Sequence, residues 1–247
     1  MRIEAVVIWH RSRSRLRCID GVYIGIYYYN ELLFNKGVWM DGLNLDKACR
    51  TLRRRDALMR KAIMRVGPCG IELDRNGFRM LVRSIIGQQL STSAARTIWK
   101  RFLKLNGGRR VTPRKMLSFK KQQLRGIGLS TAKCKAVLSI AQSLVAGDIR
   151  LRELRSLDDA QVTGELIKLR GVGPWTAQMY LMFSLGRTDV FPTGDLGIVN
   201  AVRAIYGFNR RPRETEMLQI AECWRPYRTV ASWYLWQALD IVRQGDW

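Results

Sequence analysis

Along most of the chain, apolar residues recur every three or four positions, the spacing of helices that pack one face against a core. Residues 45–66 keep this spacing throughout, so we predict one helix that stops at Gly67 and Pro68. Residues 78–86 are mostly apolar and predict a buried helix that ends near Gly87. The pattern therefore indicates a predominantly helical protein.

Turn-forming residues divide the rest of the sequence into further helices. Hydroxyl side chains at 91–93 are good helix caps, so a helix is expected from there through Leu105, closed by Asn-Gly-Gly at 106–108. We expect shorter helices beyond it, separated at four places: Pro113, the glycine turn at 126–128, Gly147-Asp148 and Gly164.

The first 39 residues differ from this pattern. They are rich in arginine, and residues 22–29 are aromatic and β-prone. We treat residues 1–39 as an N-terminal extension and residues 40–247 as the helical domain. Three interpretations of the extension stay open: a small strand pair, a disordered arm, or translated sequence upstream of a true start at Met40.

The net charge narrows the class of partner. Lys and Arg number 43 against 20 Asp and Glu, which gives a formal charge of +23 and a pI near 10.7. Solvated helix faces account for part of this charge, but the basic runs at 11–17 and 53–55 exceed what solubility needs. A field of this sign attracts polyanions, so nucleic acid is the favoured partner and an anionic membrane surface the weaker alternative. No apolar run is long enough to cross a bilayer.

Cysteine and histidine usage argues against a metal centre. The five cysteines are odd in number and scattered, which suits reduced thiols in the cytoplasm. There is no Cys-x-x-Cys pair, and the single histidine is His10, so neither zinc nor a cysteine-ligated cluster is expected. The apolar residues 5–9 are too short for a signal peptide.

A glycine hairpin, Leu-Arg-Gly-Val-Gly at 169–173, is the first candidate for binding. Glycine at 171 and 173 allows positive φ and a close approach to a partner, and Pro174 suits the first turn of a helix. Free N–H groups at such a helix start bind anions. The alternative is a tight turn between helices. The near-repeat at 124–128 lacks the proline, and we interpret it as such a turn.

Asp195 is the candidate for chemistry. It precedes a helical pattern at 196–202, where aspartate is a favoured N-cap. Capping and catalysis are compatible, because a cap holds the carboxylate still and ionised.

Four separated motifs resemble the helix-hairpin-helix DNA glycosylases, and most closely the 3-methyladenine glycosylase II branch. They are Ile-Gly-Gln-Gln-Leu-Ser at 86–91, the hairpin, Phe-Pro-x-x-Asp-Leu-Gly at 191–197 and Trp-Arg-Pro-Tyr-Arg at 224–228. The resemblance covers about residues 45–247. It implies an all-α, two-lobed fold with a central cleft: a central lobe of about 90–189 and a second lobe of 45–89 plus 190–247.

The resemblance also assigns roles. Asp195 matches the catalytic aspartate, and Gln89 the side chain that wedges into the base stack, although a loop amide that bonds the backbone is an equal alternative for Gln89. The hairpin would bind a phosphate of duplex DNA, and the carbonyls of Leu169 and Val172 would hold a monovalent cation, Na⁺ or K⁺. The residues of this hairpin site are Leu169, Gly171, Val172, Gly173 and Thr176.

Two differences from relatives sharpen the expected activity. Bifunctional relatives carry a lysine where this chain has Trp175, and an indole cannot form their Schiff base. The family's common iron–sulfur loop is missing, since only Cys223 lies near that position. We therefore expect a monofunctional enzyme without a cofactor.

The expected substrate is an alkylated purine, such as 3-methyladenine or 7-methylguanine. Its positive charge makes it a good leaving group, and the sequence shows no second carboxylate placed as an acid. A flipped base is read by stacking, and the resemblance assigns the base pocket to Trp175, Met179, Tyr180 and Trp236. We assign Trp224, Tyr227 and Trp233 to the core. A glycosylase of the same fold for another damaged or mispaired base and a non-enzymatic DNA-binding module remain alternatives. We expect a monomer.

Overall fold

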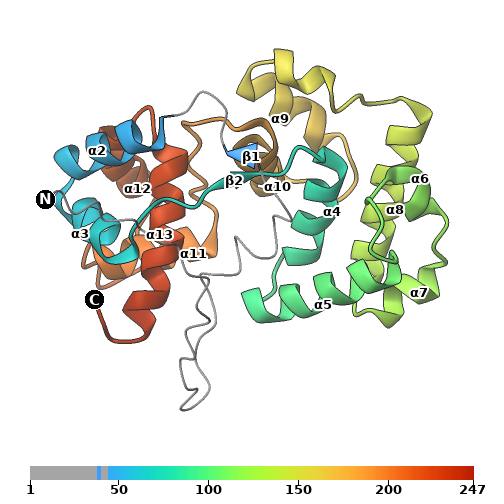
Figure 1. Cartoon of the computed structure of the whole chain (residues 1–247), viewed down its shortest axis with the longest axis horizontal. Helices are drawn as coiled ribbons and strands as arrows, with labels where there is room; N and C mark the ends of the chain where they lie inside the picture. The colour runs from blue at the N-terminus through green and yellow to red at the C-terminus, as the bar shows by residue number, and fades with distance from the viewer. Residues whose placement is uncertain (1–37, 40–43) are drawn as a thin grey trace, which may run out of the picture.

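The computed structural model describes residues 38–39 and 44–247. The β-prone segment at 22–29 lies outside the described residues. The described chain is mostly helical, as the apolar spacing predicted, and Figure 1 shows helices linked by turns and loops.

The elements follow one another in this order: β1 Val38–Trp39, α2 Leu45–Arg55, α3 Ala57–Val66, β2 Glu72–Leu73, α4 Gly77–Gly87, α5 Thr92–Leu105, α6 Pro113–Leu117, α7 Lys121–Gly126, α8 Thr131–Ala146, η1 Glu153–Ser156, α9 Asp159–Ile167, α10 Pro174–Tyr180, the π-helical turn η2 Leu181–Leu185, α11 Leu196–Ile205, α12 Glu214–Ala221, η3 Glu222–Trp224 and α13 Arg228–Arg243.

The helices form two groups. Figure 1 shows α2, α3, α11, α12 and α13 together on one side and α5–α8 on the other, with α4 and α10 between them. Within the first group α13 packs against α2, α3 and α11; α6 and α7 pack against α8, and α10 packs against α4 and α9. The strand pair joins Val38 to Leu73 and Trp39 to Glu72, so the last two residues of the N-terminal extension pair with the helical body.

The single helix predicted over residues 45–66 is wrong, because the chain breaks at Asp56. This residue is extended, with φ −142°, and its Oδ1 accepts the amides of Leu58 and Met59 at 2.8 and 3.0 Å. Its Oδ2 accepts the Tyr206 hydroxyl at 2.6 Å and the Trp224 indole N–H at 2.8 Å. One carboxylate thus caps α3 and ties it to two distant aromatic residues, which apolar spacing does not reveal.

Other expected boundaries compare as follows. The predictions for α4 and α5 are confirmed, and Gly147 ends α8 in the left-handed conformation. The expected break at Gly164 is wrong: this glycine lies inside α9. The α9 helix tolerates it because a capping box at Asp158 and Gln161 fixes its first turn.

None of the described helices is long and apolar enough to span a membrane.

Candidate active site

Asp195 caps the N-terminus of α11 and receives three hydrogen bonds. Its Oδ1 accepts the Ile198 amide at 2.9 Å and the Trp236 indole N–H at 2.8 Å. Its Oδ2 accepts the Trp175 indole N–H at 2.7 Å. Trp175 comes from α10 and Trp236 from α13, so two of the predicted pocket residues meet at the predicted catalytic carboxylate.

The three donors fix the Asp195 carboxylate and leave one of its hydrogen-bond acceptor positions unoccupied. Hydrogen bonds to an ionised group are the stronger kind, and three of them from separate elements determine the orientation of the carboxylate plane. An ionised carboxylate has about four acceptor positions, two on each oxygen. The open position is therefore on Oδ2 of Asp195, where a water or a substrate group can bind.

Gly197 allows the close approach of Trp236 to Asp195. A Cβ atom at this position would lie 2.9 Å from Cδ1 of Trp236 and 3.0 Å from Oδ1 of Asp195. Both distances are too short for ordinary packing. The glycine of the Phe-Pro-x-x-Asp-Leu-Gly motif is thus a steric requirement of the carboxylate site, a role that the sequence analysis missed although the motif contained the signal.

The segment that leads to Asp195 is held by the Trp-Arg-Pro-Tyr-Arg motif. Asp189 accepts hydrogen bonds from Arg225 and Arg228, each at 2.7 Å. The Thr229 hydroxyl accepts the Val190 amide at 3.1 Å and donates to the Arg187 carbonyl at 2.7 Å. These contacts anchor residues 187–190 on the start of α13, and they explain why the motif belongs with the site.

The glycine hairpin forms a tight turn against α8. The Val172 amide donates to the Leu169 carbonyl at 3.0 Å, and Gly171 has φ +83°. A Cβ at Gly171 would lie 2.6 Å from the Cβ of Ala136. Both the positive φ and this short distance therefore disfavour a side chain at position 171. The positive φ expected at Gly173 is wrong. Its φ is −110°, because it is the N-cap of α10 and an N-cap is extended.

The hairpin leaves several amides available at the start of α10. Among the described residues none accepts the N–H of Gly171 or Gly173. Pro174 is the first helical residue, as predicted, and the cap residue has no side chain, so the amides of Trp175 and Thr176 also have no capping acceptor. Free amides at the positive end of a helix dipole are suited to an anion.

Gln88 ties the hairpin to the end of α4. Its Nε2 donates to the Gly171 carbonyl and to the Thr176 hydroxyl, both at 3.0 Å. Lys133 of α8 in turn donates to the carbonyls of Ile86 and Gln88 at 2.8 and 2.7 Å, and partial burial lowers its pKa. The sequence analysis missed both residues. Thr176 is buried, so its side chain faces Gln88 rather than the surface.

Gln89, the predicted wedge, stands at the exposed turn between α4 and α5. Its φ of 55° lies in the left-handed region, which a residue other than glycine adopts at a cost. The backbone thus turns Gln89 outward, while its neighbour Gln88 faces inward to the hairpin.

The other two predicted pocket residues are buried in the core. Met179 and Tyr180 are 0% and 2% exposed. The Tyr180 hydroxyl donates to the Leu151 carbonyl at 3.4 Å, and its ring lies against Gly77 at the start of α4. Tyr180 is therefore not brought together with Asp195, and burial raises its pKa to about 12. Trp224 and Trp233 are buried core residues, as expected.

A cavity of about 660 Å³ borders the Asp195 turn. Trp175, Thr193, Gly194, Arg211 and Met217 are among the residues that line it. The size suits a small organic ligand. Open space thus lies beside the Trp175 indole rather than around Met179.

No group of three or more His, Cys, Asp or Glu side chains within residues 44–247 is arranged to hold a metal ion.

Comparisons with known proteins agree with this geometry. Residues 82–226 match the model of the HhH-GPD superfamily base excision DNA repair proteins. DNA-3-methyladenine glycosylase 1 of Schizosaccharomyces pombe is 34% identical over 167 residues, which are 67% of this chain and 73% of that protein. YfjP of Bacillus subtilis is 33% identical over 68% of this chain and 61% of its own length, so the chain spans less than two thirds of that relative.

A solved structure gives the same result. The S. pombe 3-methyladenine DNA glycosylase Mag1 in complex with abasic DNA has a TM-score of 0.71 and 31% identity, over 77% of this chain and 95% of that one. The matched residues 82–226 contain the Gln88 turn, the hairpin and Asp195. This chain therefore belongs to the HhH-GPD superfamily of base excision DNA repair proteins.

Proposed function

We propose that this protein is a monofunctional DNA glycosylase that removes alkylated purines of the 3-methyladenine and 7-methylguanine type from duplex DNA and leaves an abasic site. The observation that carries the proposal is the Asp195 carboxylate, fixed by two indole N–H groups near a hairpin with free amides. Relatives named for 3-methyladenine glycosylase activity support the substrate class.

The hairpin binds the DNA backbone. The amides of Gly171, Gly173 and the first turn of α10 bind one backbone phosphate of the damaged strand. This contact carries no sequence information, but it sets the register of the strand. The nucleotide beside it is then presented, flipped out of the stack, to Asp195.

Asp195 stabilises the charge that develops on the sugar. The bond between C1′ and the base nitrogen breaks, and the electron pair leaves with the base, whose methylated ring loses its positive charge. The resulting oxocarbenium-like sugar is stabilised by the nearby carboxylate. A water adds its oxygen to C1′ and loses a proton to the open position on Oδ2 of Asp195 or to solvent. No acid is needed, because the leaving base is neutral.

The absence of strand cleavage follows from Trp175. Its indole N–H donates to Asp195, and an indole offers no amine for a Schiff base. Lys133, which supports the hairpin, has its ammonium bonded to two backbone carbonyls. Lysine chemistry on the sugar is therefore not part of this mechanism.

The base is recognised by aromatic stacking. The half-buried indoles of Trp175 and Trp236 attract a cationic base by about 0.5–2 kcal/mol. The cavity beside Trp175 offers room for the flipped nucleotide. Gln89 fills the gap that the flipped base leaves in the stack.

Two further features belong to this proposal. A Na⁺ or K⁺ ion at the carbonyls of Leu169 and Val172 would reinforce the phosphate site, although the Leu169 carbonyl already accepts one amide. The protein acts as a monomer, since one chain supplies the carboxylate, both indoles and the hairpin.

The test is base release by wild type and Asp195→Asn from methylated duplex DNA. Asparagine also caps helices, so the variant should fold and bind DNA but lose release of 3-methyladenine. Equal release by both proteins would contradict the role of Asp195. Binding without release by the wild type would favour a non-enzymatic DNA-binding module or a glycosylase for another base.

A further inference from the structure

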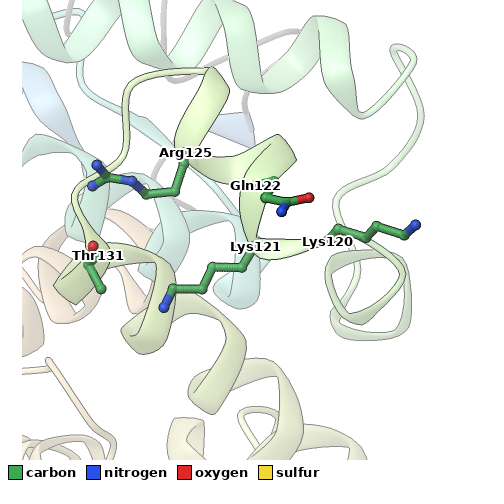
Figure 2. A pocket seen from close by; sticks show the side chains of 5 residues that line it. All are labelled: Lys120, Lys121, Gln122, Arg125 and Thr131. Carbon is green, nitrogen blue, oxygen red and sulfur yellow. The ribbon is translucent and has the colours of Figure 1, made fainter.

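A second group of positive side chains lies away from Asp195, where α7 meets α8. An open pocket of about 540 Å³ is lined by Lys120, Lys121, Gln122, Arg125 and Thr131 (Figure 2). No carboxylate lines it, and within residues 44–247 none of the three cations has an ion-pair partner. Like charges at close range repel one another, so the fold gains nothing from placing them together. A bound anion would remove this repulsion.

Lys121 and Arg125 are arranged to act on the same ligand. They are four residues apart on α7 and therefore share one face of the helix. In Figure 2 both side chains extend on the side of Thr131, whereas Lys120 extends the other way. Arg125 donates one hydrogen bond, to the Leu129 carbonyl at 3.3 Å, which positions its guanidinium. Most of its five donors remain for a ligand.

The backbone of this turn cannot bind an anion as the hairpin does. Its sequence, Leu-Arg-Gly-Ile-Gly at 124–128, nearly repeats the hairpin, but its amides are used internally. The Gly128 amide donates to the Arg125 carbonyl at 2.9 Å, and the Leu129 amide to the Leu124 carbonyl at 3.3 Å. These two amides are therefore not available to an anion, and the side chains of Lys121 and Arg125 carry the binding.

The pocket and the hairpin are fixed to the same helix. Gly171 of the hairpin packs on Ala136, five residues after Thr131 in α8. At 1.5 Å per residue, these two points of α8 are about 7.5 Å apart along its axis. One polyanion can therefore touch both places, whereas a small anion cannot.

We propose that Lys121 and Arg125 bind a backbone phosphate of the DNA duplex that the hairpin holds, as a second anchor. This inference rests on the proposed glycosylase function in one respect: that function identifies the ligand as duplex DNA. The anchor adds affinity without sequence preference, since it reads charge alone. It also limits rotation of the duplex about the hairpin, because two separate contacts define an orientation.

The test is the salt dependence of DNA binding by the Lys121→Gln/Arg125→Gln double variant. Binding to a duplex with a stable abasic analogue is measured between 50 and 200 mM NaCl. The slope of log K against log salt is negative, and each lost phosphate contact lowers its magnitude by about 0.9. We expect a fall of that size, with the melting temperature unchanged, since both side chains are exposed.

The matched control removes two charges elsewhere. Lys47 and Arg50 are exposed on α2, in the other group of helices and outside the basic run at 53–55, and Lys47→Gln/Arg50→Gln should leave the slope near the wild-type value. A fall of equal size in both double variants would mean that only total charge matters, and it would overturn the anchor. An unchanged slope in the Lys121/Arg125 variant would do the same.

A third measurement separates the anchor from the glycosylase function. Single-turnover release at saturating enzyme reports the Asp195 site alone, and it should be the same in wild type and in the Lys121/Arg125 variant. If the wild type released no base while the slopes differed as expected, the anchor would stand and the proposed activity would fail. A loss of release at saturating enzyme would place these residues in the active site and refute a purely anchoring role.

Discussion

Gly197→Ala tests whether the carboxylate geometry is set by the approach of Trp236. The added methyl would lie 2.9 Å from Cδ1 of Trp236. Ordinary contact needs 3.4 Å or more, so the indole must retreat and its 2.8 Å hydrogen bond to Asp195 lengthens. A hydrogen bond to a charged group contributes about 1.5–3 kcal/mol. If the transition state loses this amount, base release slows roughly 10- to 150-fold.

The stability of Gly197→Ala should fall less than its activity. Alanine is favoured over glycine in a helix by about 0.5–1 kcal/mol, which offsets part of the packing cost. The assay is single-turnover release of 3-methyladenine, with a thermal melt alongside. Gly164→Ala is the matched control: it lies inside α9 with no atom within 4 Å of the new methyl, so it should stabilise the protein and leave release unchanged.

A double-mutant cycle identifies the cause. In a Trp236→Phe background the hydrogen bond to Asp195 is already missing, so adding Gly197→Ala should cost little further activity. Wild-type release by Gly197→Ala would refute the steric argument. So would a double variant whose loss equals the product of the two single losses, because the two positions would then act independently.

Three other predictions follow from single contacts. Asp56→Ala removes the α3 cap and leaves Tyr206 and Trp224 without their acceptor, so the free energy of unfolding should fall by about 2–5 kcal/mol in urea melts; a fall below 1 kcal/mol would contradict the role given to this carboxylate. Gln88→Ala frees the hairpin and should raise the Kd for DNA with little change in single-turnover release; unchanged Kd would show that the hairpin holds its own shape. Burial raises the pKa of Tyr180 from 10 to about 12, so the neutral phenol is favoured in the folded state, and stability falls as pH rises through this window. Tyr180→Phe should make that decline shallower by up to about 1.4 kcal/mol per pH unit in alkaline melts, and an identical slope would show that this phenol does not contribute.

The sequence predicted local features better than contacts between distant residues. Apolar spacing located the helices but missed the break at Asp56, because the partners that hold it, Tyr206 and Trp224, lie 150 or more residues away. The motifs located Asp195 and the hairpin. They did not reveal that Trp175 and Trp236 donate to the carboxylate, since an indole N–H finds its partner only in the folded chain.

The two adjacent glutamines show the same limit at finer scale. Residues 88 and 89 are identical in sequence, and only the φ of 55° at Gln89 sends one side chain outward and the other to the hairpin. A resemblance can point to the turn, but the backbone decides which glutamine does what.

The hydrogen bond between Trp175 and Asp195 joins α10, which lies between the two groups of helices, to the group that contains α11 and α13. Trp175 belongs to α10, which packs against α4 and α9, whereas Asp195 begins α11, which packs against α13. The carboxylate to which we assign catalysis thus also links these two helices. A movement of α10 relative to α11 therefore breaks this hydrogen bond and changes the orientation of the carboxylate. We therefore expect base release to be lost at a temperature or denaturant concentration that leaves the helical content unchanged.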